Sequence, residues 1–346
     1  MGPPKKARSR VKRSFLKSLR ATFLIAGVSA GVLHSVVLGE AESESFFEHE
    51  TLVIVGAPGE ERFEKGFQAA AEAWKKAAVS TRARLEIVGL GESEEEDDLT
   101  LIESWIANLD PKSATPAWII YIGHGTHTQK NTLLNLRGPD LSAASLATQL
   151  DPLERSFVFI HGGSASAPFI NRLSKPNRIL ITATRSGDEL NYARFGERFA
   201  NVIESRTGDS NQDGQVSLLE AFVATSRSVE EFYEKSNRLA SEHALIDDNG
   251  DSVGTPSDWF RGERLVKQPE GDRIPDGFRS RQIAFIPSPQ EKMLTPEQRF
   301  ARDQLEAELE SLRGRKSYFD EDRYYEQLEA ILLKLGSIYL EDTRDS

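Results

Sequence analysis

Two continuous apolar runs of strand length place the strongest constraint on how this chain can fold. One covers residues 117–122 and leads into a Gly-His-Gly turn at His124, and the other covers residues 157–160 and leads into a small-residue turn that contains Ser164. A strand without polar alternation predicts a parallel sheet that is buried on both faces. Ligands of such sheets bind beyond the carboxyl ends of the strands. The candidate functional residues His124 and Ser164 are therefore expected at one edge of a buried sheet.

Strand and helix patterns alternate through the first half of the chain. The expected strands cover residues 51–56, 84–90, 118–122, 157–160 and 178–184, with helices at 62–78, 99–109 and 142–150. This alternation predicts a doubly wound α/β fold, with a mainly parallel sheet between helical layers. A chain of 346 residues with 38% apolar content can bury one such core and carry an appendage.

The pattern changes near the C-terminus. Between residues 296 and 340, leucine and isoleucine recur at helical spacing on two stripes, which Gly314 and Asp320 separate. We expect a C-terminal helical pair, whose apolar stripes pack on each other or on the core, or form a partner-binding hairpin. The α/β domain is expected to cover residues 51–265, followed by a linker at 266–295.

The N-terminal 41 residues resemble an export segment. Eight lysines and arginines lie within residues 5–20, an apolar stretch covers residues 21–38, and small residues follow at cleavage spacing. This layout predicts a signal peptide or an uncleaved N-terminal anchor. We therefore expect an exported protein, periplasmic or secreted, that meets a membrane only through an uncleaved N-terminus.

Composition excludes cysteine chemistry and disfavours nucleic acid as a partner. The chain has no cysteine, so it forms no disulfides and has no thiol nucleophile. Its formal net charge of −11 argues against nucleic acid as the main partner.

The most specific motif is a twelve-residue loop at 209–220. It places oxygen ligands at positions 1, 3, 5, 7, 9 and 12 and a turn glycine, Gly214, at position 6. The predicted ligands are Asp209, Asn211, Asp213, Gln215, Ser217 and Glu220. This spacing predicts a structural Ca²⁺ site, and the alternative is a polar turn that caps the following helix. No cofactor with a catalytic role is expected.

A weaker version of the same pattern follows at residues 247–251. Thr255 and Asp258 stand at the later ligand spacings, but Ser252 replaces the turn glycine. The segment is either a second Ca²⁺ site or a hydrogen-bonded turn rich in Asp and Asn.

Ser164 could act as a nucleophile if an imidazole reaches its proton. His124 is one candidate base, because it ends a strand of the same expected sheet, and His161 is another, because it is close in sequence. The serine does not stand in a Gly-x-Ser-x-Gly elbow, which disfavours an α/β-hydrolase.

These features together resemble the legumain and caspase class of peptidases, over about residues 52–260. The turn at residues 122–125 is similar to the Ser-Gly-His-Gly of that class, which implies a catalytic role for His124. Residues 164–167 are similar to its Cys-x-Ser-Gly turn, which implies the nucleophile position for Ser164, with Gly163 as the rival and Ser166 as a lesser alternative. The resemblance implies a caspase-like three-layer sandwich that acts on proteins or peptides.

The same resemblance extends to the loop after the expected strand at 178–184. Residues 182–189 correspond to a segment that helps to line the substrate pocket, which implies pocket roles for Arg185 and Glu189. Residues 242–251 resemble the corresponding segment of bacterial caspase-like proteins, in which a calcium-type loop precedes that segment.

The chain departs from the family at the nucleophile. A thiol with a pKa of about 8.5 yields some thiolate near neutral pH, whereas a serine hydroxyl needs a closely bonded, oriented base. Two functions follow. One is an inactive peptidase-fold protein that binds peptides or partners through the vestigial site, and the alternative is a serine-type hydrolase with a His124/Ser164 dyad.

Overall fold

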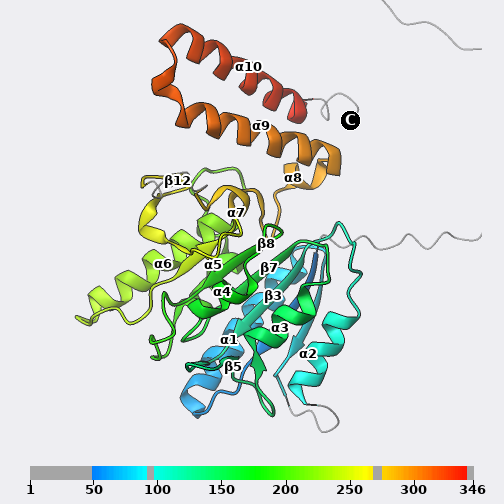
Figure 1. Ribbon diagram of the computed structural model, residues 1–346, viewed down its shortest axis with the longest axis vertical. Helices are drawn as coiled ribbons and strands as arrows, with labels where there is room; N and C mark the ends of the chain where they lie inside the picture. Colours follow the sequence, from blue (N-terminus) through cyan, green and yellow to red (C-terminus); the bar gives the residue numbers. More distant parts are fainter. Residues whose placement is uncertain (1–48, 92–96, 268–274, 341–346) are drawn as a thin grey trace, which may run out of the picture. The chain divides into compact units, whose positions relative to one another are not determined.

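A seven-stranded sheet forms the centre of the fold in the computed structural model, which describes residues 49–91, 97–267 and 275–340 (Figure 1). The strands lie in the order β10-β9-β8-β7-β3-β1-β2, and the five from β2 to β8 pair in parallel. They are β1 (His49–Val55), β2 (Ala83–Val88), β3 (Ala117–Ile122), β7 (Phe157–His161) and β8 (Arg178–Thr182). The edge strands β9 (Leu245–Asp247) and β10 (Thr255–Pro256) run antiparallel.

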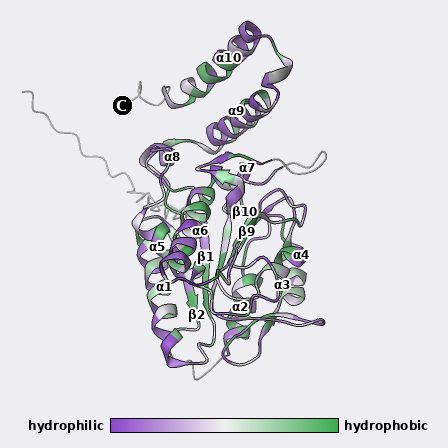
Figure 2. Cartoon of the chain, turned by 90° about the vertical axis from the view of Figure 1, so that its left-hand side faces the viewer, coloured by the Kyte–Doolittle hydropathy of each residue, from purple (hydrophilic) through white to green (hydrophobic). Residues whose placement is uncertain are grey.

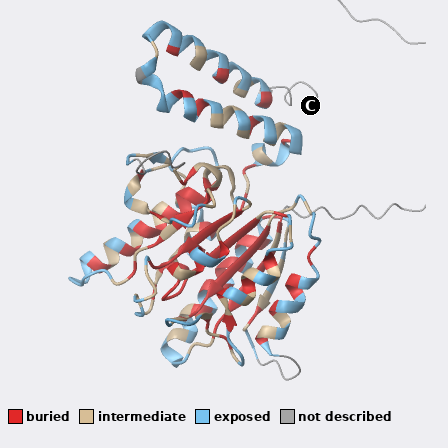
Figure 3. Cartoon of the chain, in the orientation of Figure 1, coloured by how far each residue is buried: buried red, intermediate tan, exposed pale blue. Residues whose placement is uncertain are grey.

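The central strands are buried on both faces, as their apolar runs predict. In β3, Trp118 and Ile120 pack into one hydrophobic core, while Ile119 and Tyr121 pack into the other. Every residue of β3, β7 and β8 is buried, and Figure 3 shows these strands as the most continuously buried part of the fold.

Helices cover the two faces of the sheet. The first core contains residues of α1 (Glu61–Val79), α5 (Phe195–Ser205) and α6 (Leu218–Lys235). The second contains residues of α2 (Asp98–Ala107), α3 (Ala143–Leu150) and α4 (Ile170–Leu173). The predicted three-layer α/β architecture with a mainly parallel sheet is confirmed.

The chain changes direction within the sheet between β1 and β3. It passes from β1 through α1 to β2 on one side, then returns through α2 to β3 on the other side of β1. A crevice at such a switch point is the usual ligand site of open parallel sheets. The turn with His124 directly follows β3 at this point. A small three-stranded sheet follows, formed by β4 (Gly125–His127), β5 (Thr132–Leu134) and β6 (Leu141–Ser142).

The C-terminal helical pair is also confirmed. The helices are α9 (Pro296–Gly314) and α10 (Glu321–Leu340), and they pack on each other through a separate apolar cluster that includes Leu309, Leu312 and Ile331. Figure 2 shows hydrophilic residues interspersed with hydrophobic ones along both helices. The stripes predicted from leucine spacing therefore cover one another.

The segment predicted as a linker is partly structured and reaches the core. It contains α7 (Phe278–Gln282) and α8 (Pro289–Met293). Between these helices, Phe285 is fully buried, with its ring centroid 4.9 Å from that of Trp74 and 5.0 Å from that of Trp118. The backbone carbonyl of Phe285 also lies 3.1 Å from Nε2 of His49.

The predicted export segment at residues 1–41 lies outside the described residues. Within the described ranges, the protein has no helix with both the length and the apolar character needed to cross a bilayer.

Candidate functional site

His124 sits in an aromatic environment at the carboxyl end of β3. Its ring centroid lies 4.9 Å from that of Phe63, 5.4 Å from that of Phe67 and 5.9 Å from that of Tyr192. Burial lowers the pKa of His124, while a hydrogen bond to the Pro58 carbonyl and the charge of Glu60 act in the opposite direction. The imidazole is therefore neutral at pH 7.

The Pro58 carbonyl is a partner of His124 that the sequence analysis did not identify. It belongs to the loop between β1 and α1, on the other side of the switch point. The only sequence signal was the turn at residues 56–59, which directly follows the first buried strand. Because every residue has a backbone carbonyl, the pattern of side chains in a sequence cannot show which carbonyl will accept this hydrogen bond.

Ser164 is buried and bonds to backbone. Its Oγ accepts a hydrogen bond from the Gly125 N–H at 3.3 Å and donates to the Gly125 carbonyl at 3.4 Å. Within the described chain, no hydrogen bond joins Ser164 to an imidazole. The fold thus brings His124 and Ser164 into neighbouring turns, but the serine proton is directed to a peptide carbonyl. The proposed dyad stays a prediction.

The turns after β3 and β7, residues 123–125 and 162–165, are in direct backbone contact, and we call them the paired turns. A Cβ atom added at Gly163 would lie 2.0 Å from the Gly123 carbonyl oxygen, and one at Gly125 would lie 2.2 Å from the Ser164 carbonyl oxygen. Both distances are far below van der Waals contact. Gly163, the rival nucleophile position, has no space for a side chain in this arrangement.

His161, the other candidate base, is fully buried beneath the paired turns. Its Nδ1 lies 3.2 Å from the Gly163 N–H that donates to it, and its ring packs between those of Tyr121 and Phe169, with centroids 4.9 and 4.8 Å away. With Nδ1 accepting, the neutral ring carries its proton on Nε2, for which the described residues supply no partner. Burial lowers the pKa of His161 to about 3. It therefore supports the turn and does not contact Ser164 Oγ through a hydrogen bond.

Ser166, the lesser alternative, ties the β7 turn to the end of β8. Its Oγ lies 3.0 Å from Thr184 Oγ1 and accepts the Thr184 N–H at 3.0 Å. It is completely buried, so its hydroxyl serves the junction between the two turns.

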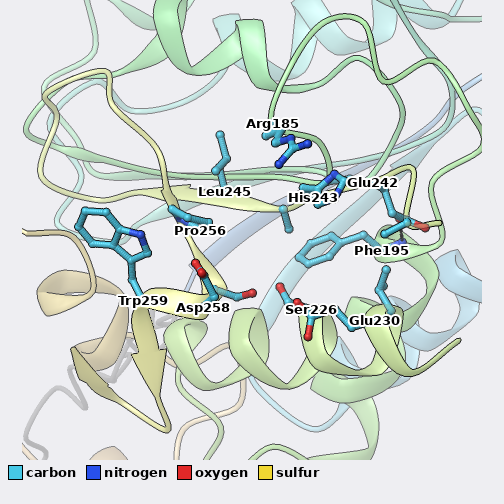
Figure 4. Close-up of a pocket in the computed structure, with 15 residues that line it drawn as sticks. Arg185, Phe195, Ser226, Glu230, Glu242, His243, Leu245, Pro256, Asp258 and Trp259 are labelled. Atoms are coloured by element: carbon cyan, nitrogen blue, oxygen red, sulfur yellow. Dashed lines mark hydrogen bonds between the residues drawn. The ribbon is translucent and has the colours of Figure 1, made fainter. Parts of the chain in front are cut away.

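The two predicted pocket residues form an ion pair. Arg185 Nε lies 3.5 Å from Glu189 Oε1, and Glu189 also contacts Nδ1 of His243 at 2.5 Å. The Glu189 carbonyl accepts the Ala165 N–H at 2.9 Å, which joins this loop to the paired turns. Arg185 and His243 line a cavity of about 380 Å³, shown in Figure 4. Sequence analysis missed His243, which is distant in sequence from the loop it contacts.

A cavity of about 650 Å³ adjoins His124. It shares Phe63 and Tyr192 with the aromatic environment of that histidine. Its lining residues are Arg62, Phe63, Gly66, Tyr192, Arg194, Glu197, Arg198 and Asn201. The charged side chains of this lining are thus three arginines and one glutamate, Glu197, whose pKa is raised by burial. We call this cavity the arginine pocket.

Arg194 is the most available cation of the arginine pocket. Its guanidinium lies over the rings of Phe232 and Tyr192, at 4.2 and 5.5 Å from their centroids, and has no ion pair among the described residues. In contrast, Arg62 pairs with Glu60 and Arg198 contacts the Ser228 hydroxyl.

The loop at residues 209–220 has the turn that its sequence predicts. Gly214 has φ +86° and Gln212 has φ +62°. The Asp209 carboxylate accepts the backbone N–H groups of Asp213 and Gly214, at 3.2 and 3.1 Å. Glu220 forms a capping box with Ser217 at the start of α6.

The oxygen donors of this loop suit Ca²⁺ in type and number. Burial and the nearby charges of Glu220 and Asp209 raise the pKa of Asp213, so the carboxylates are close enough to repel each other. Within the described ranges, however, no three acidic or histidine side chains already converge as a metal cluster. The side-chain oxygen of Gln215 accepts the Ser288 N–H. The backbone carbonyl of Gln215 is therefore the oxygen left to bind a cation at this loop position.

The acidic segment at residues 247–251 is organised by hydrogen bonds. Asp248 accepts the N–H groups of Gly277 and Ser280, while Asp276 accepts that of Asp248 itself at 2.8 Å. Asp258, a predicted late ligand, instead pairs with Lys267. Hydrogen bonds of this kind fit the turn alternative, and a second Ca²⁺ site at this segment stays a prediction.

Comparisons with known proteins give a remote similarity. No family model and no curated protein matches the chain. Among solved structures, the Drosophila initiator caspase Dronc has 14% identity and a TM-score of 0.39, covering 65% of this chain and 93% of that one. Caspase-1 from Spodoptera frugiperda has 10% identity and a TM-score of 0.39, covering 59% and 88%. A protein from Geobacter sulfurreducens has 10% identity and a TM-score of 0.38, covering 57% and 92%. Identities and TM-scores this low assign the chain to no family.

Replacing His161 with asparagine should reduce the loss of stability in acid. The unfolded chain takes up a proton near pH 6.5, whereas the folded imidazole stays neutral down to about pH 3, so its contribution is lost as the pH falls. Between pH 7 and 5, the wild type should lose about 2 kcal/mol more than His161→Asn in urea unfolding. Asp276, whose pKa is raised to about 8, acts in the opposite sense but equally in both proteins. Identical pH dependence of the two proteins would contradict the assignment of His161.

Gly163→Ala should destabilise the fold, because the added methyl group meets the Gly123 carbonyl. We expect a loss of about 1–3 kcal/mol in the free energy of unfolding. The matched control is Gly336→Ala in α10, where an added Cβ meets nothing within 4 Å and should be neutral or stabilising by up to about 1 kcal/mol. Wild-type stability of Gly163→Ala would mean that the paired turns separate easily.

Proposed function

We propose that this protein is an exported caspase/legumain-like peptidase-fold protein that binds a peptide segment without cleaving it. The observation that carries the proposal is the backbone contact of the paired turns. It closes the space that a side chain at Gly163 would need, and it directs the Ser164 proton to the Gly125 carbonyl. A hydrolase would need one of these two positions to present a nucleophile to a base.

The state of His124 supports binding over catalysis. Its hydrogen bond to the Pro58 carbonyl would orient a general base, as acyl-transfer enzymes require. The hydroxyl that such a base would activate is committed to Gly125. An oriented base is thus paired with a hydroxyl that bonds to the Gly125 backbone, and this supports binding over cleavage.

The arginine pocket supplies the binding chemistry. Guanidinium groups form charge-assisted, often bidentate hydrogen bonds with carboxylates. Arg194 has no competing ion pair among the described residues, and its place beside Tyr192 puts it near His124. We therefore propose that the preferred peptide carries an acidic side chain, which enters this pocket.

We also propose that Ca²⁺ bound by residues 209–220 stabilises the domain. The twelve-residue donor spacing and the left-handed turn at Gly214 support this role. The loop leads into α6 through the Glu220 capping box, so a bound cation would fix the start of a core helix.

Arg194→Ala should weaken the binding of acidic peptides. Loss of one charged hydrogen-bonding group costs about 1.5–3 kcal/mol, or roughly 10- to 100-fold in affinity. Fluorescence anisotropy with labelled peptides carrying Asp or Glu, and with their Asn and Gln counterparts, would measure the effect. Arg227→Ala is the matched control, because that exposed arginine on α6 pairs with Glu231 and lies outside the pocket.

Equal affinity for acidic and neutral peptides would contradict the proposed ligand. Mass spectrometry of the recovered peptides tests the absence of cleavage in the same samples. Cleaved peptide, together with fluorophosphonate labelling of Ser164, would overturn the non-hydrolytic reading and support the His124/Ser164 alternative.

Added Ca²⁺ should raise the melting temperature of the protein. At a concentration one hundred times its dissociation constant, the cation would stabilise the folded state by about 2.7 kcal/mol. Asp209→Asn should abolish the shift, while Asp322→Asn on exposed α10 should keep it. An unchanged melting temperature in calcium and in chelator would exclude a structural site.

A further inference from the structure

The cavity of about 380 Å³ shares no lining residue with the arginine pocket. Its walls come from α6, from β9 with the segment before it, and from the 3-10 turn η2 (Ser257–Trp259). Figure 4 shows Arg185 and His243 on one side, with Ser226 and Glu230 on α6 across from them. We call it the histidine pocket. Its apolar lining residues are Ala183, Phe195, Val229, Ala240, Ala244, Leu245, Pro256 and Trp259.

His243 presents a hydrogen-bond acceptor in the histidine pocket. Its Nδ1 lies 2.5 Å from Glu189 Oε1, so the carboxylate accepts the Nδ1 proton, and the tautomer that this contact selects has its lone pair on Nε2. Glu189 is itself fixed, because its Oε2 accepts the N–H groups of Arg185 and His243 at 3.0 and 3.2 Å. No described residue bonds Nε2, and the side chain is 34% exposed. The ring is therefore oriented while one of its atoms is free for a ligand.

The free charge in the pocket is negative. Arg185 is countered by Glu189, and Asp258 by Lys267. Glu242 is buried, and its Oε2 accepts the backbone N–H groups of both Arg194 and Phe195. Among the carboxylates of the lining, Glu230 is the one for which the described residues supply neither an ion pair nor a hydrogen bond.

These groups define the ligand by complementarity. Two free acceptors, His243 Nε2 and the Glu230 carboxylate, require a group rich in donors and positive in charge. Trp259 and the apolar wall favour a planar cation on an apolar stem, because guanidinium groups stack on aromatic faces. The volume lies at the small end of ligand pockets, which suits one long side chain.

We propose that the histidine pocket binds an arginine side chain, with His243 and Glu230 as its hydrogen-bond acceptors. That the side chain belongs to a peptide rests on the proposed function. The choice of a guanidinium group rests on the pocket alone. The Glu189 carbonyl also bonds to Ala165, so the pocket is attached to the paired turns through the same loop that orients His243.

The test uses the full chain and N-acetyl-arginine amide, titrated by ligand-observed NMR. N-acetyl-citrulline amide is the uncharged probe of the same shape. The arginine probe should bind at least tenfold more tightly than the citrulline probe. Equal binding of the two, or no binding of either, would overturn the proposal.

Variants assign the contacts. Glu230→Gln and His243→Ala should each weaken arginine binding at least tenfold, and His243→Gln should recover part of the loss, because its amide oxygen can replace the Nε2 acceptor. Glu231→Gln is the matched control: this neighbour on α6 pairs with Arg227 and Lys235 and does not line the pocket. Glu230 is exposed, so its replacement leaves the fold intact and keeps the test decisive if His243→Ala fails to fold. Wild-type affinity of Glu230→Gln would contradict the proposal.

The outcomes separate this pocket from the proposed function. If acidic peptides bind and the arginine probe does not, the histidine pocket is wrongly assigned and the peptide-binding function stands. If the arginine probe binds with the expected variant effects and acidic peptides do not bind, the pocket stands and the proposed function fails.

Discussion

The backbone contact between the paired turns governs the chemistry of this site. Glycine at residues 125 and 163 allows the chain ends of β3 and β7 to approach until peptide oxygens lie where side chains would otherwise begin. Glycine permits such approach because it has no Cβ. The contact then fixes Ser164, whose hydroxyl both donates to and accepts from Gly125. The space beside Ser164 is thereby filled by the backbone of the paired turns.

His124 and His161 are both affected by burial in the same direction, but they have different roles in the structure. It lowers the pKa of both, so neither carries a charge at neutral pH. His161 bonds to Gly163 and supports the turn from below, while His124 lies among aromatic rings beside the arginine pocket. A neutral His124 adds no repulsion to a pocket that already holds three guanidinium groups.

The sequence predicted the features that depend on local periodicity. The apolar runs at residues 117–122 and 157–160 identified the buried parallel strands, and leucine spacing identified the C-terminal helical pair. The same patterns placed His124 and Ser164 at one edge of the sheet, because the carboxyl ends of parallel strands meet at the same edge. Which hydrogen bonds each side chain makes was not predictable in this way.

What the sequence could not supply were the partners that come from distant segments. The Pro58 carbonyl is a backbone atom, and His243 meets Glu189 across more than fifty residues. Arg194 can be recognised as a candidate binding residue only from its contacts with the rings of Phe232 and Tyr192 in the folded protein. Such contacts depend on the packed fold and leave no periodic signal in the chain.

Phe285 shows that the α/β domain does not end where its sequence pattern ends. Its ring fills a space among Trp74, Trp118 and His49, and the adjacent Ile283 carbonyl accepts the N–H of Leu218 at the start of α6. A chain shortened to residue 265 would remove the cover from two tryptophan side chains and from His49 at the start of β1. The C-terminal segment is thus an integral wall of the core, and a natural cleavage between residues 265 and 283 would leave a fragment that must stay bound for the remainder to stay folded.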